Sequence, residues 1–146
     1  MPPNKTVNIL LVEDDEIDAE AVMRAMHNQR IANPIVVARD GIEALQHLRG
    51  EAGKVPLDQP FIILLDLNMP RMNGIEFLQE MRGDPVLKGC IVFVLTTSDA
   101  DRDKVAAYDQ QIAGYMVKSQ AGEDFLNLID IIDMYWRYVE FPPDKD

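Results

Sequence analysis

The sequence predicts a single doubly wound α/β domain, in which helices cover both faces of a five-stranded parallel sheet. Five apolar segments of strand length alternate with five segments of helical periodicity along the 146 residues. Two of the apolar segments, residues 61–65 and 90–95, are continuous, as is typical of strands buried on both faces of a parallel sheet. The chain is also long enough to bury one hydrophobic core without disulfides. We expect the domain to span residues 7–140, between a loose lead (1–6) and a short tail (141–146).

The amino-terminal half is expected to contain two strands and two helices. The first strand covers residues 7–12 and runs into four consecutive acids. A helix from residue 17 to about residue 30 follows, and Asp14 or Asp15 can cap it. Its apolar positions are Ile17, Ala21, Val22, Ala25 and Met26. The second strand covers residues 35–38, Asp40-Gly41 forms a turn or cap before a short helix, and residues 50–60 form a loop.

The carboxy-terminal half is expected to contain three strands and three helices. The third strand, residues 61–65, ends at Asp66, and a loop of residues 67–73 leads to a helix closed by Gly83-Asp84-Pro85. The fourth strand is followed by a polar helix from about 101 to 111, with Val105 and Tyr108 as its main apolar residues. The fifth strand lies within residues 112–117, and a last helix runs from about 122 to 139, where two prolines stop it.

Composition excludes several classes of function. The 25 acidic and 14 basic residues give a net charge of −11, which argues against nucleic acid or an anionic membrane as the main partner. The single cysteine, Cys90, cannot form an internal disulfide and begins an apolar run, so a buried, reduced thiol is expected. No apolar stretch is long enough to cross a bilayer and no leader precedes the first strand, so we expect a cytoplasmic protein.

Charged and polar residues follow four of the five strands at the edge where ligands bind in open parallel sheets. They are Glu13, Asp14, Asp66, Thr96 and Lys118. Taken singly, each has a simpler interpretation as a cap, a helix-start acid or a solvated surface residue. Together they predict a site, because clustered carboxylates repel one another unless a divalent cation such as Mg²⁺ joins them. An ionised Asp beside such a cation can attack phosphorus, and a lysine and a hydroxyl can stabilise the charge on the transferred group.

Four segments resemble the receiver domain of two-component response regulators: LLVEDDE (10–16), LLDLNMPRMNG (64–74), VLTTS (94–98) and GYMVKS (114–119). The resemblance covers residues 7–139 and implies a flavodoxin-like sheet in the order 2-1-3-4-5. It implies that Asp66 accepts a phosphoryl group from a sensor histidine kinase. Asp14, Asp66 and the carbonyl of Asn68 would hold Mg²⁺, with Glu13 acting largely through water. Lys118 and Thr96 would contact the phosphoryl group, and Tyr115 would move inward with Thr96 as a switch.

Two residues depart from the family pattern. Ser119 stands where the family has a proline joined to the lysine through a cis bond, and a cis bond before a non-proline residue costs about 3–4 kcal/mol. We expect that cis bond to be retained, because it aims Lys118. Thr97 replaces a smaller residue and narrows access to the phosphate. Asn68 and Ser98 occupy positions that the family uses to set the lifetime of the acyl phosphate.

The last helix favours a partner surface. Its apolar residues cover about half of the circumference, wider than the ~100° stripe of a core-facing helix. They include Phe125, Leu128, Ile129, Ile132 and Trp136. A deeper core is the alternative interpretation, and we expect a symmetric homodimer. The helix, together with MVKS and LNMPRMNG, resembles the stand-alone regulators paired with bacterial phytochromes, which implies a light-sensing kinase as donor.

Three other functions compete with a terminal regulator that is not itself an enzyme. A phosphorelay intermediate, passing the phosphoryl group to a histidine phosphotransferase, fits the same residues. A Mg²⁺-dependent phosphohydrolase of the haloacid dehalogenase type would need an acid at position 68, where Asn68 cannot transfer a proton. A flavodoxin-like binding module would need a phosphate-cradling loop after the first strand, where residues 13–16 are acids that repel phosphate.

Overall fold

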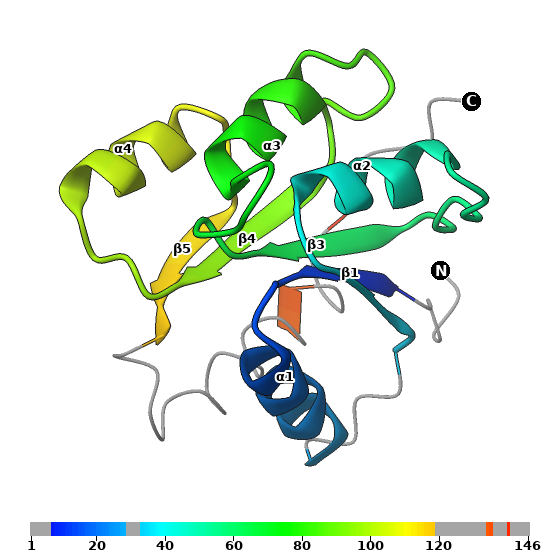
Figure 1. Cartoon of the computed structure of the whole chain (residues 1–146), viewed down its shortest axis with the longest axis horizontal. Coiled ribbons are helices and arrows are strands. Elements are labelled where there is room, and N and C mark those ends of the chain that lie inside the picture. Colours follow the sequence, from blue (N-terminus) through cyan, green and yellow to red (C-terminus); the bar gives the residue numbers. More distant parts are fainter. Residues whose placement is uncertain (1–6, 29–32, 119–133, 136–139, 141–146) are drawn as a thin grey trace.

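The structure is a computed structural model that describes residues 7–28, 33–118, 134–135 and 140. Its five strands form one parallel sheet in the order β2-β1-β3-β4-β5, which confirms the predicted class and strand order. The strands are β1 (Asn8–Val12), β2 (Ile35–Ala38), β3 (Phe61–Leu65), β4 (Ile91–Thr96) and β5 (Gly114–Val117). The helices are α1 (Glu16–Asn28), α2 (Gly41–Arg49), α3 (Gly74–Arg82) and α4 (Asp101–Tyr108). Among the described elements, α1 covers one face of the sheet and α2, α3 and α4 cover the other (Figure 1).

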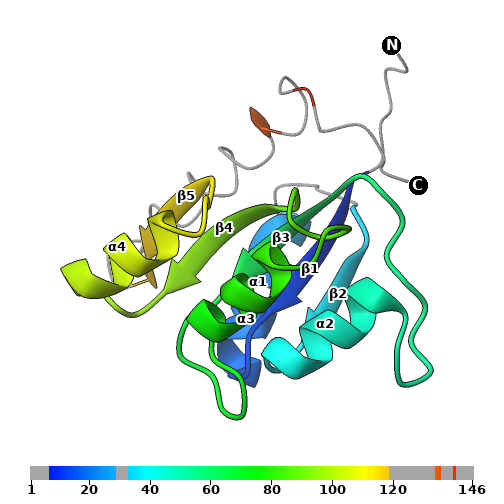
Figure 2. The same cartoon turned by 90° about the horizontal axis from the view of Figure 1, so that it is seen from above.

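The sheet divides the hydrophobic core into two clusters, because successive side chains of a strand point to opposite faces. Leu10, Ile63 and Val92 pack with α2, α3 and α4. Ile9, Ile62 and Phe93 pack with α1 on the other side. The central strands are therefore buried on both faces, as their continuous apolar runs predict. Figure 2, viewed from above, shows α2 on the β2 side of the sheet and α3 between α2 and α4.

The apolar face of α1 is confirmed at Val22, Ala25 and Met26 but not at Ile17 and Ala21. In α1, Ile17 is 78% exposed, and the buried residues are Ala19, Val22, Ala25 and Met26. Ala21 is also exposed. The core-facing stripe therefore starts at Ala19, which is small enough to let the helix approach the sheet.

Helix α4 departs from expectation in its length and its packing. It ends at Tyr108 rather than near residue 111, and residues 109–111 form turns. Val105 and Tyr108 are exposed, while the small Ala107 is the buried residue. Helix α4 therefore places one buried residue in the core, fewer than α1, α2 or α3.

Several sequence predictions lie outside the described residues. They concern the lead (1–6), the Lys118–Ser119 bond, most of the last helix and the tail (141–146). Of the last helix, Met134 is 55% exposed, whereas Tyr135 packs edge-to-face on Phe93 with ring centroids 5.1 Å apart. Tyr135 thus follows the deeper-core alternative. Among the described helices, none combines the length and the apolar character needed to span a bilayer.

Candidate functional site

The strand register brings the predicted acids together. Val12 pairs with Leu65, so the next residues, Glu13 and Asp66, leave the sheet side by side. With Asp14 they form a cluster in which one carboxylate oxygen from each residue lies within 4.8 Å of the others. Glu13 and Asp66 are buried, at 4% and 7% exposed, while Asp14 is exposed at the rim. The cluster is therefore open to solvent on one side only.

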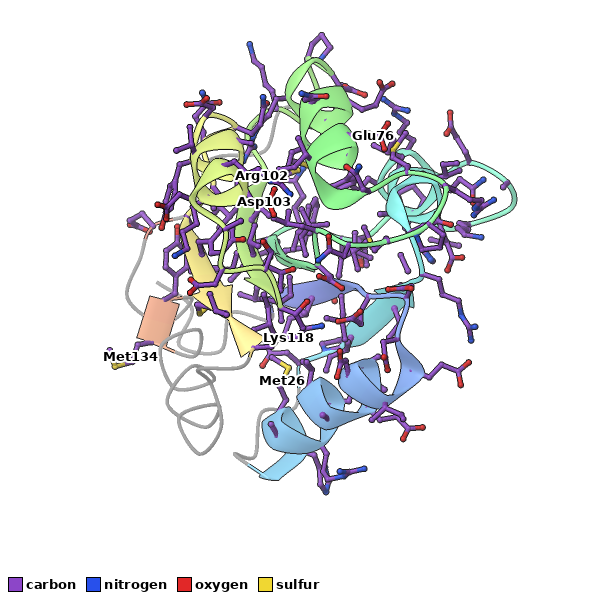
Figure 3. The ribbon with its side chains drawn as sticks, turned by 60° about the vertical axis from the view of Figure 1, so that its left-hand side comes forward. Met26, Glu76, Arg102, Asp103, Lys118 and Met134 are labelled. Atoms are coloured by element: carbon purple, nitrogen blue, oxygen red, sulfur yellow. The ribbon has the colours of Figure 1, made fainter. Side chains whose placement is uncertain are left out.

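Lys118 provides the positive charge that faces this cluster. It follows β5, whose Val117 pairs with the last residue of β4, Thr96. Figure 3 shows Lys118 between the end of β5 and helix α1. Its ammonium donates a short hydrogen bond to Glu13 and another of 2.9 Å to Asp18 Oδ2. Asp66 Oδ2 lies 3.7 Å away, close enough for an ion pair but too far for a hydrogen bond.

Burial and neighbouring charges shift the pKa values of Glu13 and Lys118. Burial raises the pKa of Glu13 to about 7; the nearby Asp66 adds to that rise, and Lys118 opposes it. Burial by itself would lower the pKa of Lys118, but its hydrogen bonds to Glu13 and Asp18 outweigh burial and raise it. Lys118 is therefore charged at neutral pH, and it offsets part of the repulsion among the acids.

The loop after β3 holds Asp66 in position. The Asp66 N–H donates to the carbonyl oxygen of Val12 at 3.0 Å, and Gly74 N–H donates to Leu67 O at 2.9 Å. A Cβ on Gly74 would lie 2.6 Å from the carbonyl oxygen of Asp66, so only glycine lets α3 start this close to the site. Asn68 is exposed beside Asp66 and lines a shallow depression with Asp14, Leu67, Met69, Pro70 and Asn73.

The same loop is fastened to the start of α2. Arg71, at a φ of 62°, donates a 2.6 Å hydrogen bond to Asp40 Oδ2. Asp40 is buried and also caps α2, because its Oδ1 accepts the N–H of Glu43. Burial alone would raise the pKa of Asp40, but Arg71 and the cap hydrogen bond lower it. One buried carboxylate thus fixes both the helix start and the Asp66 loop.

Thr96 and Tyr115 lie on adjacent strands near the acids. Thr96 is fully buried, and among the described residues its hydroxyl has no hydrogen-bond partner. Tyr115 is half-buried and donates a 2.9 Å hydrogen bond to the carbonyl oxygen of Ser98, two residues after Thr96. The pair is therefore linked through the β4–α4 loop. The Ser98 hydroxyl donates to Asp103 of α4 at 2.5 Å, and Thr97 is exposed beside the site.

Sequence reasoning missed three residues around the site: Asp18, Asp40 as the partner of Arg71, and Arg71 itself. An acid in a first helical turn is ordinarily interpreted as favouring the helix dipole. For Asp18 a signal was available, because it lies four residues before the buried Val22 and so faces the sheet. No local pattern indicates the Arg71–Asp40 pair, which joins residues 31 positions apart.

The donor set fits a small divalent cation. Ligand oxygens 2.0–2.1 Å from Mg²⁺ lie at most about 4.2 Å apart, so the three carboxylates need only small rotations to share one ion. The exposed Asn68 adds a carbonyl oxygen at the same edge. The buried Thr96 hydroxyl is a donor available to an anion bound beside Asp66.

Known proteins resemble this chain in sequence and in fold. A family model described as response regulator receiver domain matches residues 9–130. Response regulator Rcp1 of Synechocystis is 34% identical over 128 residues, which cover 88% of this chain and 87% of Rcp1. The crystal structure of the phosphorylated cyanobacterial phytochrome response regulator RcpA matches with a TM-score of 0.84 and 34% identity, covering 95% of this chain and 100% of RcpA. The Mn²⁺-bound form of Rcp1 matches with a TM-score of 0.80 and 32% identity, covering 94% of this chain and 99% of that one.

Proposed function

The chain belongs to the response regulator receiver domain family, and from this membership we propose that it accepts a phosphoryl group on Asp66 with the help of Mg²⁺. One observation carries the proposal. Glu13, Asp14 and Asp66 gather their carboxylates within 4.8 Å, and the ammonium of Lys118 lies 3.7 Å from Asp66. A nucleophilic carboxylate, a cation site and a fixed positive charge are the parts that phosphoryl transfer needs.

The metal ligands in this proposal are Asp14, Asp66 and the carbonyl oxygen of Asn68, with Glu13 acting largely through a bridging water. Mg²⁺ supplies charge neutralisation for the phosphoryl oxygens. The rim position of Asp14 and the exposure of Asn68 leave one side of the site accessible to a phosphodonor. The Mn²⁺-bound form of Rcp1 supports a divalent cation in a close relative.

In the proposed transfer, a carboxylate oxygen of Asp66 attacks the phosphorus of a phosphohistidine. The new P–O bond forms as the P–N bond breaks, and the imidazole leaves with the electron pair and takes a proton from solvent. Lys118 stabilises the negative charge of the bound phosphoryl group. The Thr96 hydroxyl donates to a phosphoryl oxygen, and the movement of Thr96 and Tyr115 carries the change to α4 and β5.

The proposed donor is a sensor histidine kinase, and the similarity to the phytochrome response regulator RcpA and to the bacteriophytochrome response regulator AtBRR extends the proposal to a bacteriophytochrome kinase. We propose a cytoplasmic, stand-alone regulator whose domain spans residues 7–140, and a signalling role rather than turnover of a substrate. A phosphorelay intermediate remains the second candidate. Transfer of label from the phosphorylated chain to an added histidine phosphotransferase would favour it.

The test uses acetyl phosphate and Mg²⁺ with intact-mass detection. The mass of the wild-type chain should rise by about 80 Da, and the adduct should be labile to hydroxylamine as an acyl phosphate is. Asp66→Asn should abolish the rise, whereas Asp58→Asn, in an exposed loop, should not. A phosphorylated Asp66→Asn chain would contradict the assignment, and many turnovers of a small phosphoester per chain would favour a phosphohydrolase.

We also propose a homodimer formed through the last helix. Met134 supports it, because this apolar side chain is 55% exposed, whereas Tyr135 is used within the molecule. Sedimentation with and without phosphorylation tests the proposal. A chain that remains monomeric at high micromolar concentration in both states would contradict it.

A further inference from the structure

Asp18 contacts Lys118 from helix α1, outside the acidic cluster of Glu13, Asp14 and Asp66. Its Oδ2 lies 2.9 Å from the Lys118 ammonium, and its side chain is 40% exposed. The side chains of Glu13 and Asp66, the other two carboxylates near the ammonium, are only 3% and 8% exposed. Figure 3 shows Lys118 between the end of β5 and helix α1, and Asp18 accepts its hydrogen bond from the α1 side.

The three carboxylates around Lys118 differ in whether they can also contribute to a cation site. Glu13 and Asp66 belong to the cluster whose oxygens can join around a divalent cation, and Asp18 does not. The carboxylates of Glu13 and Asp66 would be drawn toward a divalent cation in the cluster, and the ammonium of Lys118 would be repelled by it. Of the three carboxylates that pair with Lys118, Asp18 is the one that stays available to it.

We propose that Asp18 is a positioning residue for Lys118, which keeps the ammonium beside Asp66 while a divalent cation occupies the acidic cluster. The inference rests on the metal-dependent site of the proposed function. Asp18 lets two cations, Lys118 and the metal, occupy neighbouring positions by giving Lys118 a counter-charge of its own. Without Asp18, Lys118 would have to share Glu13 and Asp66 with the metal, and each cation would weaken the binding of the other.

Isothermal titration of the full chain with MgCl₂ tests this coupling without any phosphodonor. Asp18→Asn keeps the size of the side chain and should weaken Mg²⁺ binding roughly fivefold, a typical coupling between two sites. Asp15→Asn is the matched control. It removes the same charge from the same helix start and keeps a capping oxygen for Ile17 and Asp18, and Asp15 makes no ion pair with Lys118 within the described chain. Its effect should be clearly smaller.

A double-mutant cycle separates positioning from simple charge. Lys118→Met removes the cation that Asp18 holds, so adding Asp18→Asn to it should change the Mg²⁺ affinity no more than Asp15→Asn does. Asp18→Glu, which restores the carboxylate, should recover most of the wild-type affinity. Thermal unfolding of each chain without metal checks that the variants are folded.

Three results would overturn the inference: equal effects of Asp18→Asn and Asp15→Asn, an Asp18→Asn effect that persists unchanged beside Lys118→Met, or tighter Mg²⁺ binding by Asp18→Asn. A wild-type chain that binds no Mg²⁺ would overturn both this inference and the metal role in the proposed function. A chain that shows the coupling but takes no phosphoryl group from acetyl phosphate would contradict the proposed function and leave the positioning role of Asp18 supported.

Discussion

Asp40 serves two segments of the chain with one buried carboxylate. One of its oxygens caps α2 through Glu43 N–H, and the other accepts the hydrogen bond of Arg71. Asp40 is 4% exposed, so loss of its partners would leave an uncompensated charge. The loop that carries Asn68 therefore depends on a residue that is distant in sequence from the proposed metal ligands.

Two substitutions of Asp40 should separate the contribution of the α2 cap from that of the contact with Arg71. Asp40→Ala removes both contributions. It should lower the free energy of unfolding by roughly 1–2 kcal/mol or more, because the loss of an N-cap alone costs about that much. Asp40→Asn keeps a capping oxygen and should cost less. Urea unfolding at pH 7 measures both values, and equal losses for the two variants would contradict a separate role of the charge.

The pKa of Asp40 gives a pH test of the same contact. Because the folded-state pKa lies below the ordinary value near 3.9, the ionised carboxylate stabilises the folded chain fully above about pH 4. That contribution is lost as the pH falls through the folded-state pKa. The stability difference between wild type and Asp40→Asn should therefore shrink from pH 7 to pH 3 in urea unfolding. A difference independent of pH would show that charge is not its source.

At the scale of the element, α3 begins in contact with the residue it helps to position. A Cβ on Gly74 would lie 2.6 Å from Asp66 O and 2.7 Å from Leu67 Cα, both of them backbone atoms. Gly74→Ala should therefore cost about 1–3 kcal/mol of overpacking and slow the phosphorylation of Asp66. Gly83→Ala is the control at the other end of α3, where φ is −81° and the nearest atom is 3.5 Å away. Chemical unfolding and acetyl phosphate kinetics measure both, and a neutral Gly74→Ala would contradict the close approach.

The far end of α3 is tied down by one guanidinium. Arg82 donates hydrogen bonds to four backbone carbonyl oxygens at 2.7–3.0 Å, and burial lowers its pKa. The acceptors are the carbonyl oxygens of Lys88, Cys90, Gln110 and Gln111.

Removing this guanidinium should be costly. Arg82→Met should lower the free energy of unfolding by roughly 2–4 kcal/mol, since hydrogen bonds of a charged donor contribute more than neutral ones. Arg102→Met, on the exposed side of α4, should be close to neutral. Urea unfolding measures the free energy of unfolding of both variants. Similar decreases in the two would contradict the anchoring role of Arg82.

How well the elements could be predicted depended on how strong their local signal was. The bounds of β2 and β3 are confirmed as the sequence predicts them, because apolar runs between turn residues leave few alternatives. The packed faces of α1 and α4 were predicted less well. Small residues, Ala19 and Ala107, contact the sheet there, and the larger Ile17 and Val105 are exposed. Periodicity that weights large apolar residues cannot find a face built from alanine.

The gathering of the candidate site residues at one edge of the sheet was predictable for a different reason. Parallel strands end at one edge, so residues placed after separate strands meet there whatever lies between them. The sequence therefore indicated Glu13, Asp66 and Lys118 without any knowledge of side-chain contacts. Asp18 and Arg71 were missed because their partners are fixed only by packing of α1 and of the β3–α3 loop.

At the scale of the whole molecule, we expect charge repulsion among the acids to link the stability of the chain to the proposed metal binding. The chain carries a net charge of −11, and three of its acids crowd one edge of the sheet. MgCl₂ at a hundred times its dissociation constant should add about 2.7 kcal/mol to the free energy of unfolding. Thermal unfolding against NaCl of equal ionic strength measures the specific part.

The matched variant for that experiment is Asp14→Asn. It should be at least as stable as wild type without metal, because one repelling carboxylate is gone, and it should lose most of the Mg²⁺-dependent gain. The same gain in Asp14→Asn as in wild type would show that Mg²⁺ acts elsewhere on the acidic surface.

Arg82 and the acids occupy opposite ends of the same sheet, since the carbonyls it gathers precede β4 and β5 while the acids follow β1 and β3. The hydrogen bonds of Arg82 are thereby separated from the candidate site by the length of the strands. The exposed Thr97 beside Asp66 makes none of the hydrogen bonds of Arg82, so a change there should leave that anchor intact. Related chains can therefore differ in the residues that meet a phosphodonor while they keep the same sheet and the same Arg82 anchor.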